Sequence, residues 1–279
     1  MSGPTVSGSV VAQQFTGGAA ATLNSFFNSS TTFTVVSTAG TSTVSGPAVV
    51  ATNNTALTIS GATAVADTSS GGNSLTITTP AAIVAAPNDT IGASAASTIF
   101  GANTGTTHFT ASGSGSSVKG GAGGFTGTVS GANSTLIGGT GVSIVSVSGA
   151  NTLAVAGSAG ITGINESSTA GAETIATNPL GNAGTMVATL GSGADTVLGG
   201  SGASTITGGS ATDVFAFIKG HAGGSEVIIG FTTKDNFAFA GYGYTATDLP
   251  TEAVGSVGDV ITLSDGTTIT LAGYDHRIF

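Results

Sequence analysis

Between Leu190 and Ala216 the chain repeats a nine-residue unit three times without interruption. The units read LGSGADTVL, GGSGASTIT and GGSATDVFA, each with glycines or other small residues first and a short apolar tail. A turn followed by a strand of about three residues cannot bury its apolar side chain alone, so such units must stack into coils. The repeat therefore predicts a solenoid of short parallel strands, with neighbouring coils about 4.8 Å apart.

Weaker copies of the unit occur upstream, and their spacing along the chain slips. GANSTLIGG (131–139) and GANTLAVAG (149–157) begin two units apart, and GSGSSVKGG (113–121) is a looser copy. The pattern predicts a degenerate solenoid rather than a regular array. The expected fold class is all-β: a parallel β-roll or β-solenoid with short glycine-rich turns, plus a C-terminal β-sandwich-like cap with a hairpin.

Three regions are expected along the chain. Residues 1–88 form a strand-rich N-terminal β region, 89–218 form the solenoid, and 219–279 form a C-terminal β cap. The sequence leaves open whether residues 1–88 continue the solenoid or fold as a separate β unit. The first region has strand-like runs between Gly, Asn and Pro residues, and no helix of ordinary length is expected. These runs are TTFTVVST (31–38), ALTIS (56–60), SLTIT (74–78) and AAIVA (81–85).

Aromatic residues gather at the start of the chain, and a hairpin signal lies near its end. The early phenylalanines are Phe15, Phe26, Phe27 and Phe33. They are expected to plug the end of the solenoid, to form a small β cap, or to dock another chain. Near the end, ITLSDGTTITL predicts a hairpin with Asp265-Gly266 at its turn.

Charge is scarce and unevenly placed. Only 6% of residues are charged, and the segment from Glu166 to Phe279 holds eleven of the thirteen acidic and three of the four basic residues. A long uncharged surface of Thr, Ser and Ala is either hydrated by its hydroxyls or covered by copies of the same chain, and we expect self-association. Four basic residues argue against binding to a nucleic acid backbone.

The N-terminal sequence does not have the form of a Sec signal peptide. MSGPTVSGSVVAQQF lacks a basic region followed by a continuous apolar run. No apolar run approaches the roughly 18 residues of a membrane-spanning helix, so no transmembrane segment is expected. The chain is therefore expected to stay in the cytoplasm or to leave it by a route that reads another signal.

Asp195 and Asp213 hold the same place in the first and third units, where the second unit has Ser204. If two units make one coil, both carboxylates lie on one edge, about 5 Å apart, and repel unless a cation lies between them. Glycine-rich turns also expose carbonyl oxygens, and calcium takes six to eight oxygen ligands. Zinc does not fit, because no His or Cys cluster is present. The alternative is that these aspartates are ordinary turn residues bonded to their own backbone.

The three units resemble the GGxGxDxUx nonapeptide of the RTX (repeats-in-toxin) family, whose repeats form calcium-loaded parallel β-rolls. Leu190, Ser204 and Ala211 depart from that pattern. The resemblance implies that Asp195 and Asp213 are side-chain ligands of calcium. The backbone carbonyl ligands that it implies lie around Gly191, Gly193, Gly209 and Ala211.

The segment after the repeats also resembles this family. DVFAFIKGHAGGSEVIIGFTTKDNFAFAG (213–241) is similar to the region that follows the repeats in type I-secreted proteins, and the closing DHRIF is similar to their C-terminal export signal. The resemblance implies a type I secretion exporter as a partner. It also implies an extracellular location, at the cell surface or in a biofilm matrix.

The expected function is a secreted calcium-binding structural protein that self-assembles outside the cell into a homopolymer, such as a biofilm matrix fibre, a filament or a surface layer. The alternative is a monomeric adhesin or glycan-binding module, with a cell-surface glycan as its ligand. No enzyme is expected, because HExxH and GxSxG are absent and His108, His221 and His276 lie far apart. An ice-binding solenoid needs threonine at one fixed place per coil, and the slipping register argues against it.

Overall fold

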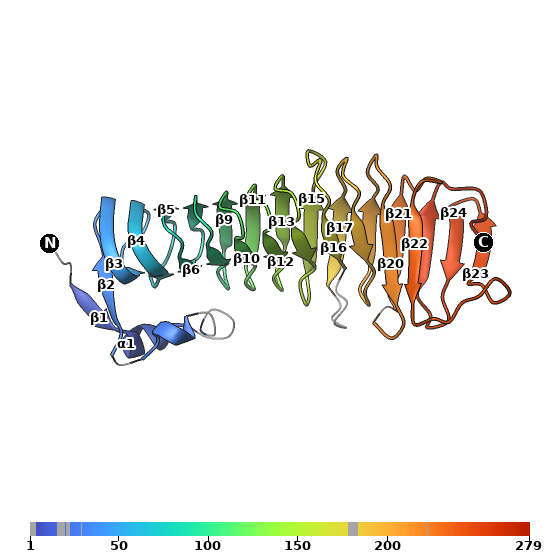
Figure 1. The fold of residues 1–279 in the computed structure, drawn as a ribbon. Coiled ribbons are helices and arrows are strands. Elements are labelled where there is room, and N and C mark those ends of the chain that lie inside the picture. The colour runs from blue at the N-terminus through green and yellow to red at the C-terminus, as the bar shows by residue number, and fades with distance from the viewer. Residues whose placement is uncertain (1–3, 16–19, 21–22, 29, 178–183, 222) are drawn as a thin grey trace. The chain divides into compact units, whose positions relative to one another are not determined.

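The computed structural model describes residues 4–15, 20, 23–28, 30–177, 184–221 and 223–279 (Figure 1). It confirms the all-β class: the chain forms a parallel β-solenoid of short strands joined by turns. Helices are short and lie near the start of the chain; they include α1 (Gly8–Ala12) and the 3-10 helix η1 (Asn24–Phe26). None of the described helices has the length and apolar character needed to span a membrane. The chain divides into two compact units, Met1–Thr135 and Leu136–Phe279.

Unit 1 (Met1–Thr135) contains two stacks of parallel strands. One stack runs through the first half of β4 to β5, β7, β9 and β11, and the other through the second half of β4 to β6, β8 and β10. The pairing of β5 with β7 runs across residue 88 without a break, so the solenoid already includes much of the expected N-terminal region. The strands are β1 (Thr5–Ser7), β2 (Thr32–Val36), β3 (Gly40–Val50), β4 (Ala56–Asp67), β5 (Ser74–Ile77), β6 (Ala82–Val84), β7 (Thr90–Ala93), β8 (Thr98–Phe100), β9 (Thr106–Ala111), β10 (Ser117–Lys119) and β11 (Gly124–Val129).

From β4 to β11 the strand register of the first stack is constant although the coil length along the chain is not. Thr76 pairs with Gly92, sixteen residues on, and Gly92 pairs with Thr110, eighteen residues on. The turns absorb the difference, so the side chains that face outward remain in columns. The expectation that the slipping register scatters the threonines is therefore wrong for this unit.

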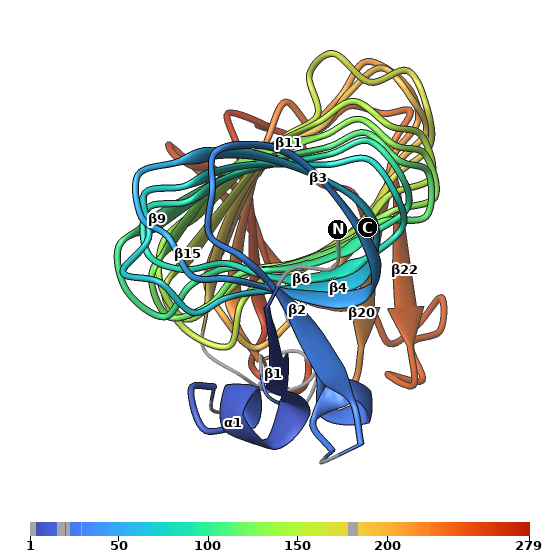
Figure 2. The ribbon, with the colours of Figure 1, turned by 90° about the vertical axis from the view of Figure 1, so that its left-hand side faces the viewer.

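The N-terminal segment covers one face of unit 1. Val11, Leu23 and Phe33 are fully buried and form a cluster with Val49, Ala64, Ala66 and Val84 of the solenoid strands. Phe15 and Phe27 stack on each other and pack against the same cluster. Figure 2 shows α1 and β1 lying outside the ring of coils, beside β2. The early phenylalanines thus cover a sheet face; the side chain of Phe26 lies outside the described set.

Unit 2 (Leu136–Phe279) also has two stacks: β13, β15, β17, β19, β21 and β25 in one, and β14, β16, β18, β20 and β22 in the other. The expected hairpin is confirmed, because β24 pairs antiparallel with β25 around Asp265-Gly266. β12 (Thr135–Ile137) lies at the division between the units. The other strands are β13 (Ser143–Val147), β14 (Leu153–Val155), β15 (Ile161–Asn165), β16 (Thr174–Ala176), β17 (Thr185–Thr189), β18 (Thr196–Leu198), β19 (Ser204–Thr207), β20 (Val214–Ile218), β21 (Ser225–Ile229), β22 (Asn236–Ala240), β23 (Thr251–Gly255), β24 (Gly258–Thr262) and β25 (Thr268–Ala272).

The three-residue strands of unit 2 each contribute a central apolar side chain to a thin core, and longer strands such as β20 contribute two. Ile175, Val197 and Phe215 pair directly from coil to coil, and each is at most 3% exposed. Coils stack so closely that some turns admit only glycine. A Cβ at Gly193 would lie 1.7 Å from the carbonyl oxygen of Gly171 in the preceding coil. Close coil stacking is thus a sufficient reason for glycine in these turns.

Replacing Gly127 by alanine tests this packing in unit 1. A Cβ there would lie 2.1 Å from the carbonyl oxygen of Phe109, so Gly127→Ala should lower the free energy of unfolding by about 1–3 kcal/mol. Gly92→Ala is the matched control, because its nearest neighbour would be 3.9 Å away. Thermal unfolding followed by circular dichroism measures both. Equal melting temperatures for the two variants would contradict the observed coil spacing.

Candidate functional site

A column of inward-facing carboxylates runs along one corner of the coils in unit 2. Its members each stand directly before a strand of the β16, β18, β20 and β22 stack, and we call it the carboxylate column. It consists of Glu173, Asp195, Asp213 and Asp235. Asp195 and Asp213 are at most 1% exposed, and they lie one coil apart on the same edge, as the nine-residue repeat requires. Ser204 lies in the other stack, where it pairs with Glu226.

Each carboxylate of the column accepts a hydrogen bond from the backbone of the preceding coil. The Glu173 N–H donates to Oδ1 of Asp195 at 2.8 Å, and the Asp195 N–H donates to Oδ1 of Asp213 at 3.0 Å. The series continues at both ends, from the Thr152 N–H to Glu173 and from the Asp213 N–H to Asp235. A buried corner leaves backbone N–H groups without a strand partner, and the carboxylates satisfy them. The column therefore joins neighbouring coils.

Burial in this position makes the charged form of the carboxylates unfavourable. Burial raises the pKa of Asp195 to about 6, partly opposed by the N–H of Glu173 and reinforced by Asp213. Burial likewise raises the pKa of Asp213 and of Glu173. Among the described residues, no lysine or arginine forms an ion pair with the column. The backbone hydrogen bonds therefore stabilise the charged carboxylates in place of a basic side chain.

Two further buried glutamates lie inside unit 2. Glu166 is fully buried, and neither of its carboxylate oxygens has a hydrogen-bond partner. Burial, followed by the charges of Asp195 and Glu173, raises the pKa of Glu166 to about 8. Glu226 accepts hydrogen bonds from the Thr177 hydroxyl and the Gly200 N–H, and burial raises its pKa to about 7. Burial therefore favours the protonated carboxyl group at Glu166, and to a smaller extent at Glu226, near neutral pH.

The predicted calcium ligands are only partly arranged for a cation. Both oxygens of Asp213 accept backbone N–H groups, from Asp195 and from Gly209, whereas Oδ2 of Asp195 has no hydrogen-bond partner. The Gly191 carbonyl accepts the Ser210 N–H. The described residues contain no group of three or more His, Cys, Asp or Glu side chains placed to hold a metal ion. Calcium binding around Asp195, Asp213, Gly191, Gly193, Gly209 and Ala211 stays a prediction.

Sequence reasoning found two members of the column and missed the others. Asp195 and Asp213 stood out because they lie in adjacent clear repeats. Glu173 and Asp235 share the same local signal, an acidic residue directly before a strand, but the coils that contain them are longer. Glu166 follows a strand, and no spacing rule marks it. Glu173 and Asp235 could have been found by allowing that signal to recur at longer spacings, whereas Glu166 could have been found only from the strand register.

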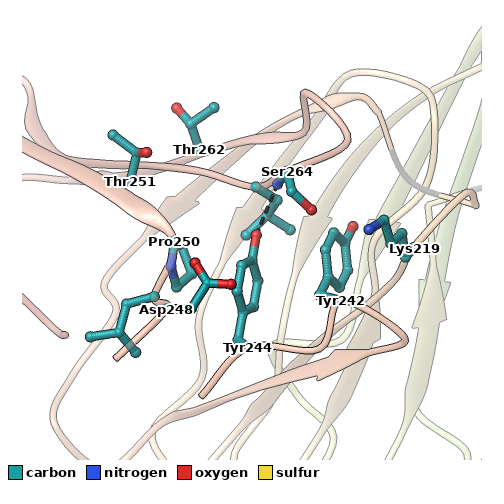
Figure 3. Close-up of a pocket in the computed structure, with 10 residues that line it drawn as sticks. Lys219, Tyr242, Tyr244, Asp248, Pro250, Thr251, Thr262 and Ser264 are labelled. Carbon is teal, nitrogen blue, oxygen red and sulfur yellow. Dashed lines mark hydrogen bonds between the residues drawn. The ribbon is translucent and has the colours of Figure 1, made fainter. Parts of the chain in front are cut away.

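A second candidate site is a cleft in the C-terminal cap of unit 2. It is lined by Lys219, Tyr242, Tyr244 and Asp248, together with residues of β23 and β24. Figure 3 shows the two tyrosine rings side by side with their hydroxyls pointing the same way. The rings are parallel with centroids 5.4 Å apart, and the Ser264 N–H donates to the Tyr244 hydroxyl at 2.8 Å. Aromatic surface beside polar groups suits a polar ligand with apolar faces.

Comparisons with protein-family models, with curated proteins and with solved structures gave no match for this chain. The fold it forms, a parallel β-solenoid, is consistent with a β-roll repeat protein.

The buried carboxyl groups predict that unit 2 is most stable under mildly acidic conditions. Because the pKa of Glu166 is raised from 4.5 to about 8, the folded protein holds its proton while the unfolded chain releases it across that range. Stability is therefore full below about pH 4.5 and falls as the pH rises towards 8. The melting temperature, measured by circular dichroism from pH 4.5 to 8.5, should decline steadily.

Glu166→Gln removes this titrating group and should make the decline shallower. Asp275→Asn is the matched control, since Asp275 is 80% exposed and should leave the profile unchanged. A wild-type melting temperature that rises between pH 5 and 8 would contradict the assignment.

Proposed function

We propose that this chain is an RTX-type structural protein that is exported by a type I system and polymerises outside the cell by strand addition. Two observations support the RTX assignment. The nine-residue units stack in the register that the repeat requires, and Asp195 and Asp213 stand one coil apart.

The observation that carries the polymerisation proposal is the presence of unpaired strand edges. In unit 2, β22 pairs with β20, and no other described strand pairs with its second edge. In unit 1, residues Gly40–Thr43 of β3 pair with β4, while β2 pairs only with the later part of β3. An unpaired edge presents a row of backbone N–H and C=O groups that can receive a strand of another chain. Edges in both units allow each copy to bind two others, which gives open growth.

The edge of β22 can be blocked by a charge. Ala238 lies at the centre of β22, and its side chain is exposed, so Ala238→Lys adds a cation to the edge without disturbing the core. Electron microscopy and light scattering of the purified wild type should show filaments or sheets that increase with protein concentration. Ala238→Lys should shift the assembly to monomers.

Thr233→Lys in the preceding exposed turn is the matched control and should assemble normally. A wild type that stays monomeric at high concentration would contradict the proposal, as would normal assembly of Ala238→Lys.

Calcium dependence is a separate part of the proposal. A shallow pocket lined by Thr152, Glu173 and Ala194 reaches the carboxylate column, and Asp195 keeps one oxygen without a partner. Calcium bound there would offset the repulsion within the column. At 100 times its dissociation constant it would add about 2.7 kcal/mol of stability per site.

Melting temperatures in chelator and in millimolar calcium measure this effect. We expect a rise with calcium that is lost in Asp195→Ala. Identical melting temperatures in the two buffers would exclude calcium binding and leave assembly by strand edges unaffected.

The alternative function, a monomeric glycan-binding module, is favoured by the Tyr242 and Tyr244 cleft. Tyr244 is only partly buried and supplies aromatic surface, while Lys219 and Asp248 supply a donor and an acceptor. Tyr244→Ala should weaken binding to a glycan array by about tenfold, as for loss of one aromatic anchor. Thr247→Ala is the matched control, because Thr247 is exposed in the same segment and lies outside the lining of the cleft. An array on which wild type and Tyr244→Ala give the same signals would remove this alternative.

A further inference from the structure

Unit 1 presents a regular array of hydroxyl groups on the sheet formed by β4, β5, β7, β9 and β11. Outward-facing side chains of these five strands line up in three parallel columns, which we call the hydroxyl face. The columns are Ala56, Ser74, Thr90, His108 and Thr126; Thr58, Thr76, Gly92, Thr110 and Thr128; and Ser60, Thr78, Ser94, Ser112 and Ser130. All of them carry a hydroxyl except Ala56, His108 and Gly92.

The array is periodic in two directions because the strand register fixes it. Along a column the repeat is the spacing between parallel strands, about 4.8 Å. Across columns it is two residues of one strand, about 6.6 Å. Thr76, Thr90, Thr110 and Thr128 are exposed, so hydroxyl and methyl groups face outward together. Threonine is β-branched and stiff at χ1, so these groups are held in place before any partner arrives.

The chemistry of the hydroxyl face restricts its partner. Asp67 and Asp89 are buried, and Lys119 lies in the other stack, so Asp, Glu, Lys and Arg contribute no charge to the columns. The columns also contain no Trp, Tyr, Phe, Leu or Met, the residues that anchor a protein or carry an apolar ligand. The clefts lined by Tyr242, by Glu173 and by Asp67 contain no residue of the columns. A flat, uncharged, periodic array of hydroxyls and methyls fits a partner that is itself a neutral lattice of hydrogen-bonding sites.

The two strand stacks of unit 1 also differ in whether the N-terminal segment covers them. The N-terminal segment covers the second stack through Val11, Leu23 and Phe33, and it leaves the hydroxyl face bare. The methyl groups of the exposed threonines in the columns therefore stay in contact with water. We propose that the hydroxyl face binds the surface of ice. This activity does not depend on the proposed polymerisation.

Ice binding is measured on the purified full chain as thermal hysteresis of a single ice crystal and as inhibition of ice recrystallisation. The wild type should show both. Thr110→Lys places a long, hydrated cation in the middle of the central column and should reduce the hysteresis by about tenfold, since removing a charge from water is costly. Thr104→Lys is the matched control: Thr104 is exposed in a turn outside the columns, and this variant should keep wild-type activity.

A gain-of-function variant keeps the test independent of any loss of folding. Gly92 interrupts the central column, and a Cβ there would meet nothing closer than the Leu75 carbonyl oxygen at 3.9 Å. Gly92→Thr therefore completes five threonines in a row and should raise the hysteresis above that of the wild type. Circular dichroism confirms that each variant is folded.

Three results would overturn the proposal. One is a folded wild type with neither hysteresis nor recrystallisation inhibition. Another is an equal loss of activity in Thr104→Lys and Thr110→Lys. The third is that Thr110→Lys leaves the hysteresis unchanged and alters the sedimentation of the protein instead. A change in the self-association of the protein alone would identify a second copy as the occupant of the face. A loss of co-sedimentation with microcrystalline polysaccharide would identify a glycan.

Discussion

Backbone hydrogen bonds between successive coils hold this structure together. In unit 2 the Thr174 N–H donates to Thr152, the Thr196 N–H to Glu173 and the Val214 N–H to Asp195, each at 2.9 to 3.0 Å. Strands of three to six residues have little side-chain surface to bury, so the ladder must be continuous for the coils to persist. Glycine in the tight turns and the inward-facing apolar residues of the strands both follow from this close, regular stacking.

The sequence predicted the solenoid well and the candidate site only in part. Nine-residue periodicity fixed the stacking of Asp195 over Asp213, and the Asp265-Gly266 turn predicted the hairpin. Neither pattern shows which way a carboxylate points, because that depends on the unpaired N–H groups at the coil corner. The sequence also did not predict the alignment of Thr76 with Thr110, because this alignment depends on strand pairing through Gly92 across coils of unequal length.

The same corner position is filled by different chemistry in the two units. In unit 1 it holds Ser116 and Ser134, whose hydroxyls donate to carbonyls of their own turns, at Gly113 and Gly131. In unit 2 it holds Glu173, Asp195 and Asp213, which accept from the coil before. Ser116 also accepts the Ser97 N–H of the preceding coil at 3.3 Å, so a serine and a carboxylate can both join two coils here, but only the carboxylate introduces an acidic group. The uneven charge along the sequence therefore reflects, in part, which hydrogen-bond acceptor fills this corner.

Because turn length varies while strand register stays constant, such a chain can accept insertions and deletions in its turns during evolution. A residue gained or lost in a turn alters neither the alternation of inward and outward side chains nor the pairing of the next coil. Insertions that would shift every position of an ordinary sheet are thus confined to one corner of one coil. The outward residues are then free to vary one at a time, so a lineage could acquire a new surface without first acquiring a new core.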